Sequence, residues 1–232
     1  ILHKIIYKYC VKKIEPYTTK FYGTLPLRVE FFKNVYGIDE RKVELLELGA
    51  DDSSFDFARR ENIRKSTRKK LKLEENDFVI VTGGKIDRRK NIHYLMRAME
   101  VLKTDNIKLI IFGSPNNEMK AEIERLSANK NIIFLGWLSS QDIYSILFAS
   151  DLGFFPGTHS VLCVFKKWNN IDHVDVGGNC EFLDEVTVKS IANKILDIYK
   201  NKELYSKMKA NAMGRGVERF TYSKIAKRAI EQ

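Results

Sequence analysis

Two glycines followed by closely spaced cations form the stretch whose residue types and spacing could do chemistry. The run VTGGKIDRRKN, Val81 to Asn91, ends an apolar segment in Gly83 and Gly84 and then contains Lys85 and Lys90. Glycine leaves the main chain open to a ligand, and a lysine ammonium is a compact positive charge that can bind anions. The stretch therefore predicts a site for a phosphate or a diphosphate.

Buried strands separated by amphipathic helices are predicted to position this stretch. FVIVTGG is a continuous apolar run of strand length, and apolar residues at helical spacing follow it from Ile92 to Leu102. The apolar runs KLIIFGS, NIIFLGW and DLGFFP come next, separated by predicted helices over 118–127 and 141–149. This alternation predicts an α/β fold with a Rossmann-like, doubly wound parallel sheet, because parallel neighbours need helical crossovers.

The carboxyl ends of parallel strands are where such a sheet binds its ligands. Gly83 and Gly84 are predicted at one of these ends, and the helix that begins near Asn91 offers unpaired N–H groups and partial positive charge to an anion. Lys85 and Lys90 as ordinary surface charges are the alternative, and Arg88 and Arg89 are interpreted as solvated loop residues. The spacing matches neither GxxxxGK[ST] nor GxGxxG, which argues against a P-loop NTPase and a dinucleotide dehydrogenase.

Composition indicates a globular, basic protein. The chain has 232 residues, of which 44% are hydrophobic, and its formal charge of +10 gives a pI near 9.4. This charge favours an anionic partner: nucleic acid, anionic lipid or a phosphorylated metabolite. No helix-turn-helix, aromatic RNP pattern or zinc finger is recognisable, so nucleic acid is not expected as a partner.

The cysteines indicate a reducing compartment, and the hydropathy pattern predicts no membrane span. Cys10, Cys163 and Cys180 are odd in number and far apart, which predicts neither a disulfide framework nor a metal site. No apolar run reaches the ~18 residues of a membrane span, and no signal-peptide pattern is present. The expected location is the cytoplasm, with a peripheral contact at the inner face of a membrane left open.

Residues 1–49 are predicted to form a unit separate from residues 50–232. An amphipathic helix is expected from Ile1 to Ile14, followed by a helix from Thr24 to Tyr36 and a strand-like piece before a junction near Gly49. The basic face of the first helix fits a solvated outer face of a packed helix or, as the alternative, a membrane contact. Helices are also predicted over 188–200, 202–213 and 223–232.

The regular alternation is broken after DLGFFP. Only GTHSVL separates this run from the next apolar run, CVFKK, whereas a parallel crossover needs a dozen or more residues. Either the two runs pair antiparallel, or residues are missing between Leu162 and Cys163. Omission is the favoured interpretation.

The segment GGKIDRRKNIHYLMRAM resembles the GRLxxxKGxxxLIxA segment of retaining glycosyltransferases of the GT-B fold, family 4 or group 1. In that family the Arg and the Lys bind the diphosphate of a nucleotide-sugar donor. The resemblance implies that Lys85 stands in place of the Arg and that Lys90 matches the Lys. Asn91 replaces the usual Gly.

The resemblance continues along the next strands. IKLIIFGS is similar to the family strand that ends in glycine, here Gly113, which is a candidate donor contact. NIIFLGWLSSQDIYSILFASDLGFFPG resembles VxFLGxxxxxxLxxLYxxADxxxxPS. It implies that Gly136 and Trp137 lie near the donor base, with ordinary packing as the alternative for Trp137. The family's pair of glutamates after PS is absent; His159 and Ser160, at this position, are candidates for donor contact, with a structural role as the alternative for His159.

The resemblance implies transfer of a sugar from a nucleoside diphosphate to a hydroxyl of a saccharide or lipid-linked acceptor, with retained anomeric configuration. Lys85 and Lys90 would stabilise the departing diphosphate, with no metal and no cofactor. Residues 1–49 would be the end of an N-terminal acceptor lobe, and residues 50–232 the donor-binding domain. A non-catalytic nucleotide- or phosphate-binding module and a sugar-nucleotide epimerase of the same fold remain alternatives.

Overall fold

The computed structural model describes residues 2–46, 49, 57–157, 183, 185–219 and 221–230. These residues divide into two compact units. Of the described residues, those in 57–157 and 183–206 form the larger unit, and those in 2–49 and 207–230 form the smaller one. The predicted junction near Gly49 borders residues outside the described ranges, as does the predicted interruption between Leu162 and Cys163.

The larger unit is built on a four-stranded parallel sheet in the order β5-β4-β3-β6. Its strands are β3 (Phe78–Ile86), β4 (Ile107–Pro115), β5 (Ile132–Gly136) and β6 (Leu152–Gly153). Each of the three neighbouring pairs is parallel. The fold class predicted from the alternating apolar runs is confirmed, although only two residues of DLGFFP pair as a strand.

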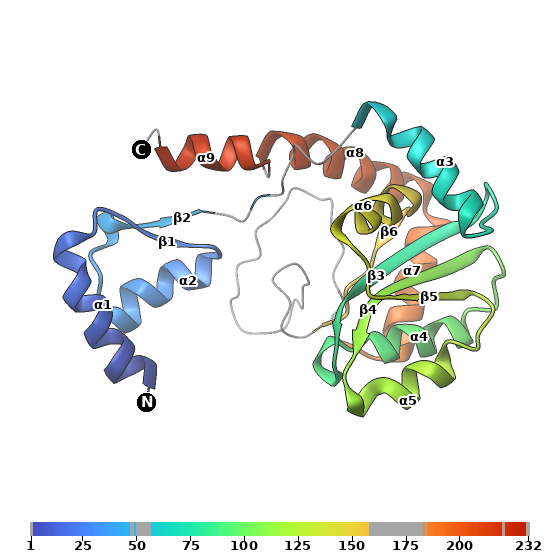
Figure 1. The fold of residues 1–232 in the computed structure, drawn as a ribbon, viewed down its shortest axis with the longest axis horizontal. Helices are drawn as coiled ribbons and strands as arrows, with labels where there is room; N and C mark the ends of the chain where they lie inside the picture. The colour runs from blue at the N-terminus through green and yellow to red at the C-terminus, as the bar shows by residue number, and fades with distance from the viewer. Residues whose placement is uncertain are drawn as a thin grey trace. The chain divides into compact units, whose positions relative to one another are not determined.

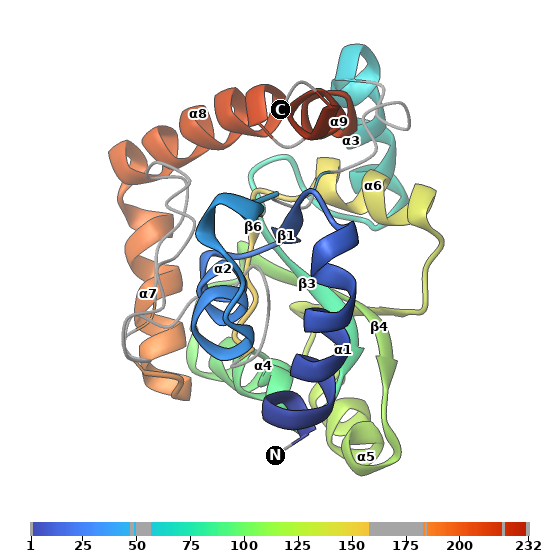
Figure 2. The same cartoon turned by 90° about the vertical axis from the view of Figure 1, so that its left-hand side faces the viewer.

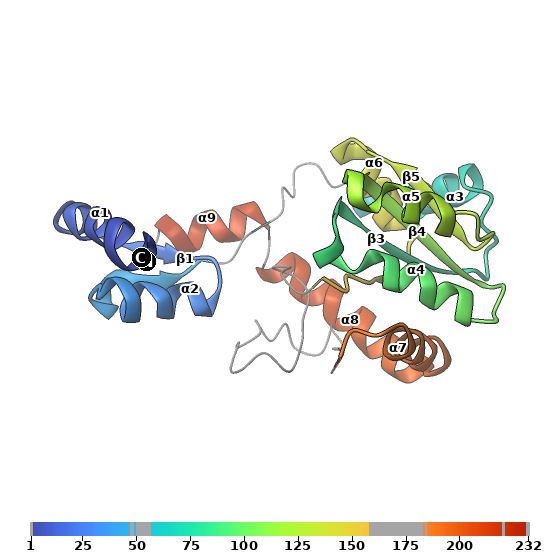
Figure 3. The same ribbon diagram turned by 90° about the horizontal axis from the view of Figure 1, so that it is seen from below.

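Helices cover both faces of this sheet (Figures 1 and 3). They are α3 (Arg60–Lys70), α4 (Ile92–Val101), α5 (Asn117–Leu126), α6 (Ser140–Ala149) and α7 (Val188–Lys200), with α8 (Lys202–Arg219) following. Ile80 and Leu109 pack with α4, α5 and α7 in one apolar cluster, whereas Val81 packs with Ile146 of α6 in another. Because both faces are buried, the strands are continuous apolar runs.

Side chains cap the helices that follow β4 and β5. Asn116 Oδ1 accepts a hydrogen bond from Met119 N at the start of α5 (3.0 Å), and Ser139 Oγ accepts one from Asp142 N at the start of α6 (3.2 Å). Helix α4 differs, because its N-cap residue, Asn91, makes no side-chain capping bond. The first N–H groups of α4 are therefore without the side-chain acceptor that a capped helix provides.

The smaller unit contains two short parallel strands surrounded by short helices (Figure 2). The strands are β1 (Phe21–Gly23) and β2 (Val43–Leu45), and the α-helices are α1 (Lys8–Ile14), α2 (Pro26–Phe31) and α9 (Tyr222–Ile230). This unit also contains π-helical segments at His3–Tyr7 and Phe32–Tyr36 and short 3-10 helices at Glu15–Tyr17 and Glu40–Lys42. In the larger unit, the 3-10 helix Phe57–Arg59 precedes α3. The core of the smaller unit consists of Phe21, Tyr36, Ile38 and Val43.

The apolar residues of the first predicted helix do not pack as expected. The helix is present, but Ile5 and Tyr9 are each 63% exposed and Ile14 is 53% exposed. Val11 is the residue of α1 that packs against the core, and Lys12 donates to Gly37 O (2.7 Å) on the same unit. Fewer residues of this helix pack against the core than the apolar pattern of the sequence predicts.

Candidate functional site

The sheet changes its direction of winding between β3 and β6. From β3 the chain adds β4 and then β5 on one side, and then returns to add β6 on the other side of β3. Ligands of open α/β sheets bind at such a switch point, beyond the carboxyl ends of the two strands. The residues in this position are Gly83 to Ile86 at the end of β3, Asp87 to Asn91 after it, and Phe154 to Gly157 after β6.

The glycines at the end of β3 have different roles. A Cβ atom on Gly83 would lie 2.5 Å from the ring of Phe112, and one on Gly113 would lie 1.9 Å from Gly84 O. Close packing between β3 and β4 therefore requires both glycines, whether or not they contact a ligand. Gly84 is exposed, has a φ of +104° and has no atom within 4 Å of its Cβ position. Of these three predicted donor contacts, Gly84 is the one that leaves main chain open to a ligand.

Asp87 organises the loop that carries both predicted lysines. Its Oδ2 lies 3.6 Å from Lys85 Nζ and 3.4 Å from Arg89 Nη2, and its carbonyl oxygen accepts a hydrogen bond from Lys90 N (3.0 Å). Burial raises the pKa of the Asp87 carboxyl, but the hydrogen bond from Arg89 and the charges of Arg89 and Lys85 outweigh it and hold the pKa below its ordinary value. A loop with several cations is thereby stabilised by one buried carboxylate, a residue that the sequence reasoning missed.

Lys85 and Lys90 have different environments. The Lys85 side chain is 68% exposed and its amine is paired with Asp87. Lys90 is partly buried, and no ion pair joins it to an acidic residue in the described ranges. Its stem lies against Gly157, where an added Cβ would be 3.2 Å from Lys90 Cδ. Lys90 is thus the lysine that the structure places at the switch point without a described acidic partner.

Arg88 and Arg89 turn to acidic neighbours, as expected for loop residues. Arg88 Nε lies 2.6 Å from Glu118 Oε1 on α5, and both side chains are more than half exposed. Arg89 is paired with Asp87. The prediction that both are solvated is confirmed by the 64% and 67% exposure of their side chains.

Gly136 and Trp137 lie at the carboxyl end of β5, two strands away from β3. Gly136 has a φ of +68° with open space around its Cβ position, and Trp137 is 76% exposed. Exposure argues against the packing alternative for Trp137, while its contact with a donor base stays a prediction. His159 and Ser160 lie outside the described residues.

His93, which the sequence reasoning did not select, is buried close to the start of α4. It is 3% exposed, and its Nδ1 has no hydrogen-bond partner among the described residues. Burial lowers the pKa of the imidazole; the charges of Glu122 and Glu118 oppose this effect, and those of Arg97 and Arg88 add to it. The lowered pKa favours the neutral imidazole, and nothing in the sequence context of His93 signals its burial.

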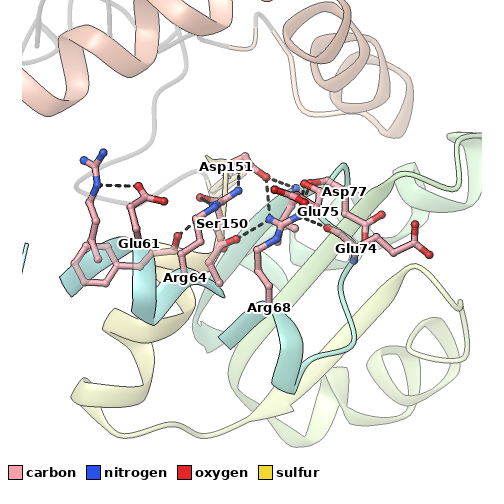
Figure 4. Close-up of polar contacts among 12 residues, drawn as sticks. Glu61, Arg64, Arg68, Glu74, Glu75, Asp77, Ser150 and Asp151 are labelled. Carbon is pink, nitrogen blue, oxygen red and sulfur yellow. Dashed lines mark hydrogen bonds and ion pairs between the residues drawn. The ribbon is translucent and has the colours of Figure 1, made fainter. Parts of the chain in front are cut away.

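A cluster of buried charges lies at the opposite, amino-terminal edge of the sheet (Figure 4). Asp151 precedes β6, and its Oδ1 accepts from Arg64 Nη2 (2.7 Å), while its Oδ2 accepts from Val79 N (2.8 Å) and lies 3.5 Å from Arg68 Nη1. Arg68 is 6% exposed and also donates to the carbonyl oxygens of Ala149, Glu74 and Asp77. These contacts hold α3 to the sheet, so the cluster is structural.

Two further features bear on function. Among the described residues, no three His, Cys, Asp or Glu side chains lie where they could hold a metal ion. In the same ranges, no helix has the length and apolar character needed to cross a bilayer.

Part of the chain matches a known family. Residues 63–164 match the family model described as glycosyl transferases group 1. An uncharacterised glycosyltransferase of Methanocaldococcus jannaschii is 24% identical over 131 residues, and the GDP-mannose-dependent monoacylated alpha-(1-6)-phosphatidylinositol monomannoside mannosyltransferase of Corynebacterium glutamicum is 30% identical over 127 residues. Each alignment covers 54% of this chain, and the chain spans 33% of the length of each relative.

Solved structures share the fold over nearly the whole chain. A glycosyltransferase from Rickettsia africae has a TM-score of 0.74 at 18% identity, covering 98% of this chain and 66% of that chain. Anabaena HepE in complex with UDP and glucose also has a TM-score of 0.74, at 17% identity, covering 97% of this chain and 65% of that chain. The α/β architecture with parallel sheets is thus that of GT-B glycosyltransferases.

Proposed function

We propose that this chain, which carries a glycosyltransferase group 1 segment, is the donor-binding part of an enzyme that transfers a sugar from a nucleoside diphosphate to an acceptor hydroxyl. The observation that carries the proposal is the position of Lys90, at the switch point of the sheet and without a described acidic partner. The names of similar proteins support a nucleotide-sugar donor, since one is GDP-mannose-dependent and another was crystallised with UDP and glucose. The retaining outcome and the saccharide or lipid-linked acceptor are part of the proposal.

The hard step of such a reaction is the build-up of negative charge on the departing diphosphate. Preorganised cations and helix-terminal N–H groups lower this barrier, because they act most strongly where charge develops. In this chain the ammonium of Lys90, the uncapped start of α4 and the open main chain at Gly84 supply these groups. Lys85 would add a second ammonium once its pairing with Asp87 is exchanged for the diphosphate. No metal is required in this scheme.

Release of the nucleoside diphosphate tests the proposed function. The full-length protein is incubated with UDP-, GDP- and ADP-sugars, with and without saccharide and lipid-linked acceptors, and free diphosphate and glycosylated product are measured. We expect release with at least one donor, increased by an acceptor. Binding without release would instead identify a non-catalytic module, and conversion to an isomeric sugar nucleotide would identify an epimerase.

The exposed apolar residues of the helical segment 2–14, which ends with α1, support a peripheral membrane contact as part of this proposal. Leu2, Ile5, Ile6, Tyr9 and Ile14 are each at least 53% exposed, and no acidic residue interrupts the lysines at positions 4, 8, 12 and 13. A helix with apolar residues on one face and lysines around it binds anionic bilayers. The expected location is therefore the cytoplasmic face of a membrane.

Vesicle flotation measures this contact. We expect the chain to float with phosphatidylglycerol vesicles, not with phosphatidylcholine vesicles, and the Ile5→Glu/Tyr9→Glu variant to lose about tenfold in partitioning because apolar burial is lost. Val101→Glu is the matched control, since Val101 is a 57% exposed apolar residue on α4 of the other unit. Equal flotation of the Ile5→Glu/Tyr9→Glu variant and the wild type would refute the membrane contact.

A further inference from the structure

Asn91 adopts a backbone conformation that few residue types tolerate. Its φ of +53° and ψ of +20° lie in the left-handed helical region, where glycine is favoured and asparagine is the usual second choice. The residue is 9% exposed and occupies the N-cap position of α4. A glycine would be sufficient for this backbone conformation, so the asparagine side chain is expected to make an additional contact.

The side chain of Asn91 reaches the loop that follows β6. Its Nδ2 donates a buried hydrogen bond to Pro156 O (3.0 Å) instead of capping α4. An asparagine side chain at an N-cap ordinarily accepts from the first turn of its own helix. Here it joins two loops that lie 65 residues apart in sequence.

This bond lies beyond the point where β3 and β6 separate. The last backbone hydrogen bond between the two strands runs from Phe154 N to Val81 O (2.9 Å), and β3 then continues to Ile86 beside β4 alone. Described hydrogen bonds therefore join the β3 and β6 sides along the paired strands, from Val79 to Val81, and again beyond them at Asn91. The segment between them contains Gly84 and Lys85, and Lys90 immediately precedes the second junction.

Gly157 extends the second junction to Lys90 itself. A Cβ atom at position 157 would lie 3.4 Å from Lys90 Cα and 3.2 Å from Lys90 Cδ, so the glycine permits the β6 loop to approach the lysine stem closely. Asn91 is hydrogen-bonded to Pro156 O, and Gly157 is the next residue in the chain. The position of the Lys90 stem relative to the β6 loop is thereby coupled to the Asn91 hydrogen bond.

We infer that Asn91 is a positioning residue that fixes the spacing of the two loops at the switch point and so places Lys90 and the start of α4 for the diphosphate. This inference rests on the proposed function. Displacement of a binding group by about 1 Å can cost a hundredfold in rate, so a hydrogen bond that sets this spacing has a measurable effect on binding and turnover.

Calorimetric titration of the full-length protein with UDP, GDP and ADP tests the inference in matched variants. Asn91→Gly keeps the left-handed backbone and removes the bond, and Asn91→Asp keeps the shape but cannot donate to Pro156 O. Asn116→Gly is the control, because it removes a side-chain hydrogen bond at the neighbouring strand-to-helix loop. We expect both Asn91 variants to bind the nucleoside diphosphate about tenfold more weakly or worse than the wild type. We expect Asn116→Gly to bind it within about twofold of the wild type, because replacing a capping residue with glycine costs little stability.

The readouts separate positioning from folding and from failure of the proposed function. A smaller folded fraction would lower the measured stoichiometry, whereas displaced loops raise the dissociation constant at unchanged stoichiometry. Wild-type affinity in Asn91→Gly would overturn the inference and leave the proposed function intact. If the wild type binds none of the three nucleotides, the proposed function fails and the inference fails with it.

Discussion

Lys90→Ala is expected to lower kcat of the proposed sugar transfer by the full-length protein about tenfold or more, which corresponds to at least ~1.4 kcal/mol of lost transition-state stabilisation. Lys90 lies at the switch point with its stem against Gly157, and no carboxylate of the described residues is paired with its ammonium. In the proposed reaction, charge would accumulate on the diphosphate as the glycosidic bond breaks, so the ammonium would act more strongly in the transition state than in the ground state. Steady-state kinetics with the preferred donor gives the measurement.

Arg88→Ala is the matched control for this variant. It removes one positive charge from the same loop, but Arg88 is exposed and paired with Glu118. We expect its kcat to stay within about twofold of the wild type, as for a surface charge in a weak ion pair. Equal losses in the two variants would mean that the loop acts through its net charge and that Lys90 has no specific role.

Asp151→Ala is expected to lower the free energy of unfolding by about 3–5 kcal/mol, because it leaves buried guanidinium groups without their carboxylate. The Asp151 side chain is 13% exposed, that of Arg68 8% and that of Arg64 26%, so solvent screens these pairs little. The backbone N–H of Val79 also loses its carboxylate acceptor. Such a loss is a large fraction of the ~5–15 kcal/mol that stabilises a typical domain.

Urea unfolding with matched variants measures this effect. Asp151→Asn keeps an oxygen acceptor for Val79 N but removes the charge, so we expect a smaller loss. Glu61→Ala removes the carboxylate of an exposed pair with Arg60 on the same helix, and its cost is expected to be ~1 kcal/mol or less. If Asp151→Ala unfolded at the same urea concentration as Glu61→Ala, with an unchanged dependence of the unfolding free energy on urea, the cluster would not hold α3 in place.

The sheet could be predicted because its strands are buried on both faces. Runs such as FVIVTGG and KLIIFGS contain four consecutive apolar residues, FVIV and LIIF, and the helices after them repeat apolar residues at helical spacing. Both signals are local in sequence. They fixed the order of strands and helices and placed Gly84, Lys85 and Lys90 at a strand end.

Helix α3 was missed because apolar residues do not hold it. Its sequence, RENIRKSTRKK, has no apolar stripe, and its contacts with the sheet run through the guanidinium groups of Arg64 and Arg68. The partner, Asp151, lies more than eighty residues away. The spacing of apolar residues does not reveal a helix that is attached through buried arginines, since an arginine is usually a surface residue.

Details of the candidate site depended on contacts that sequence does not display. Gly83 and Gly113 were predicted as donor contacts, yet the packing of Phe112 and Gly84 already requires them. Asn91 was noted only as a departure from the usual glycine, and its bond to Pro156 O joins segments far apart in the chain. Such pairings follow from strand order and loop conformation, which the residue types alone do not specify.

Binding of nucleoside diphosphates tests most directly whether the carboxyl ends of β3 and β6 hold a diphosphate. The full-length protein is titrated by calorimetry with UDP, GDP and ADP, and with the corresponding nucleosides. We predict that at least one diphosphate binds, that its nucleoside binds about tenfold more weakly or worse, and that Lys90→Ala removes most of this difference. A diphosphate that binds no better than its nucleoside, or a difference that persists in Lys90→Ala, would contradict the account.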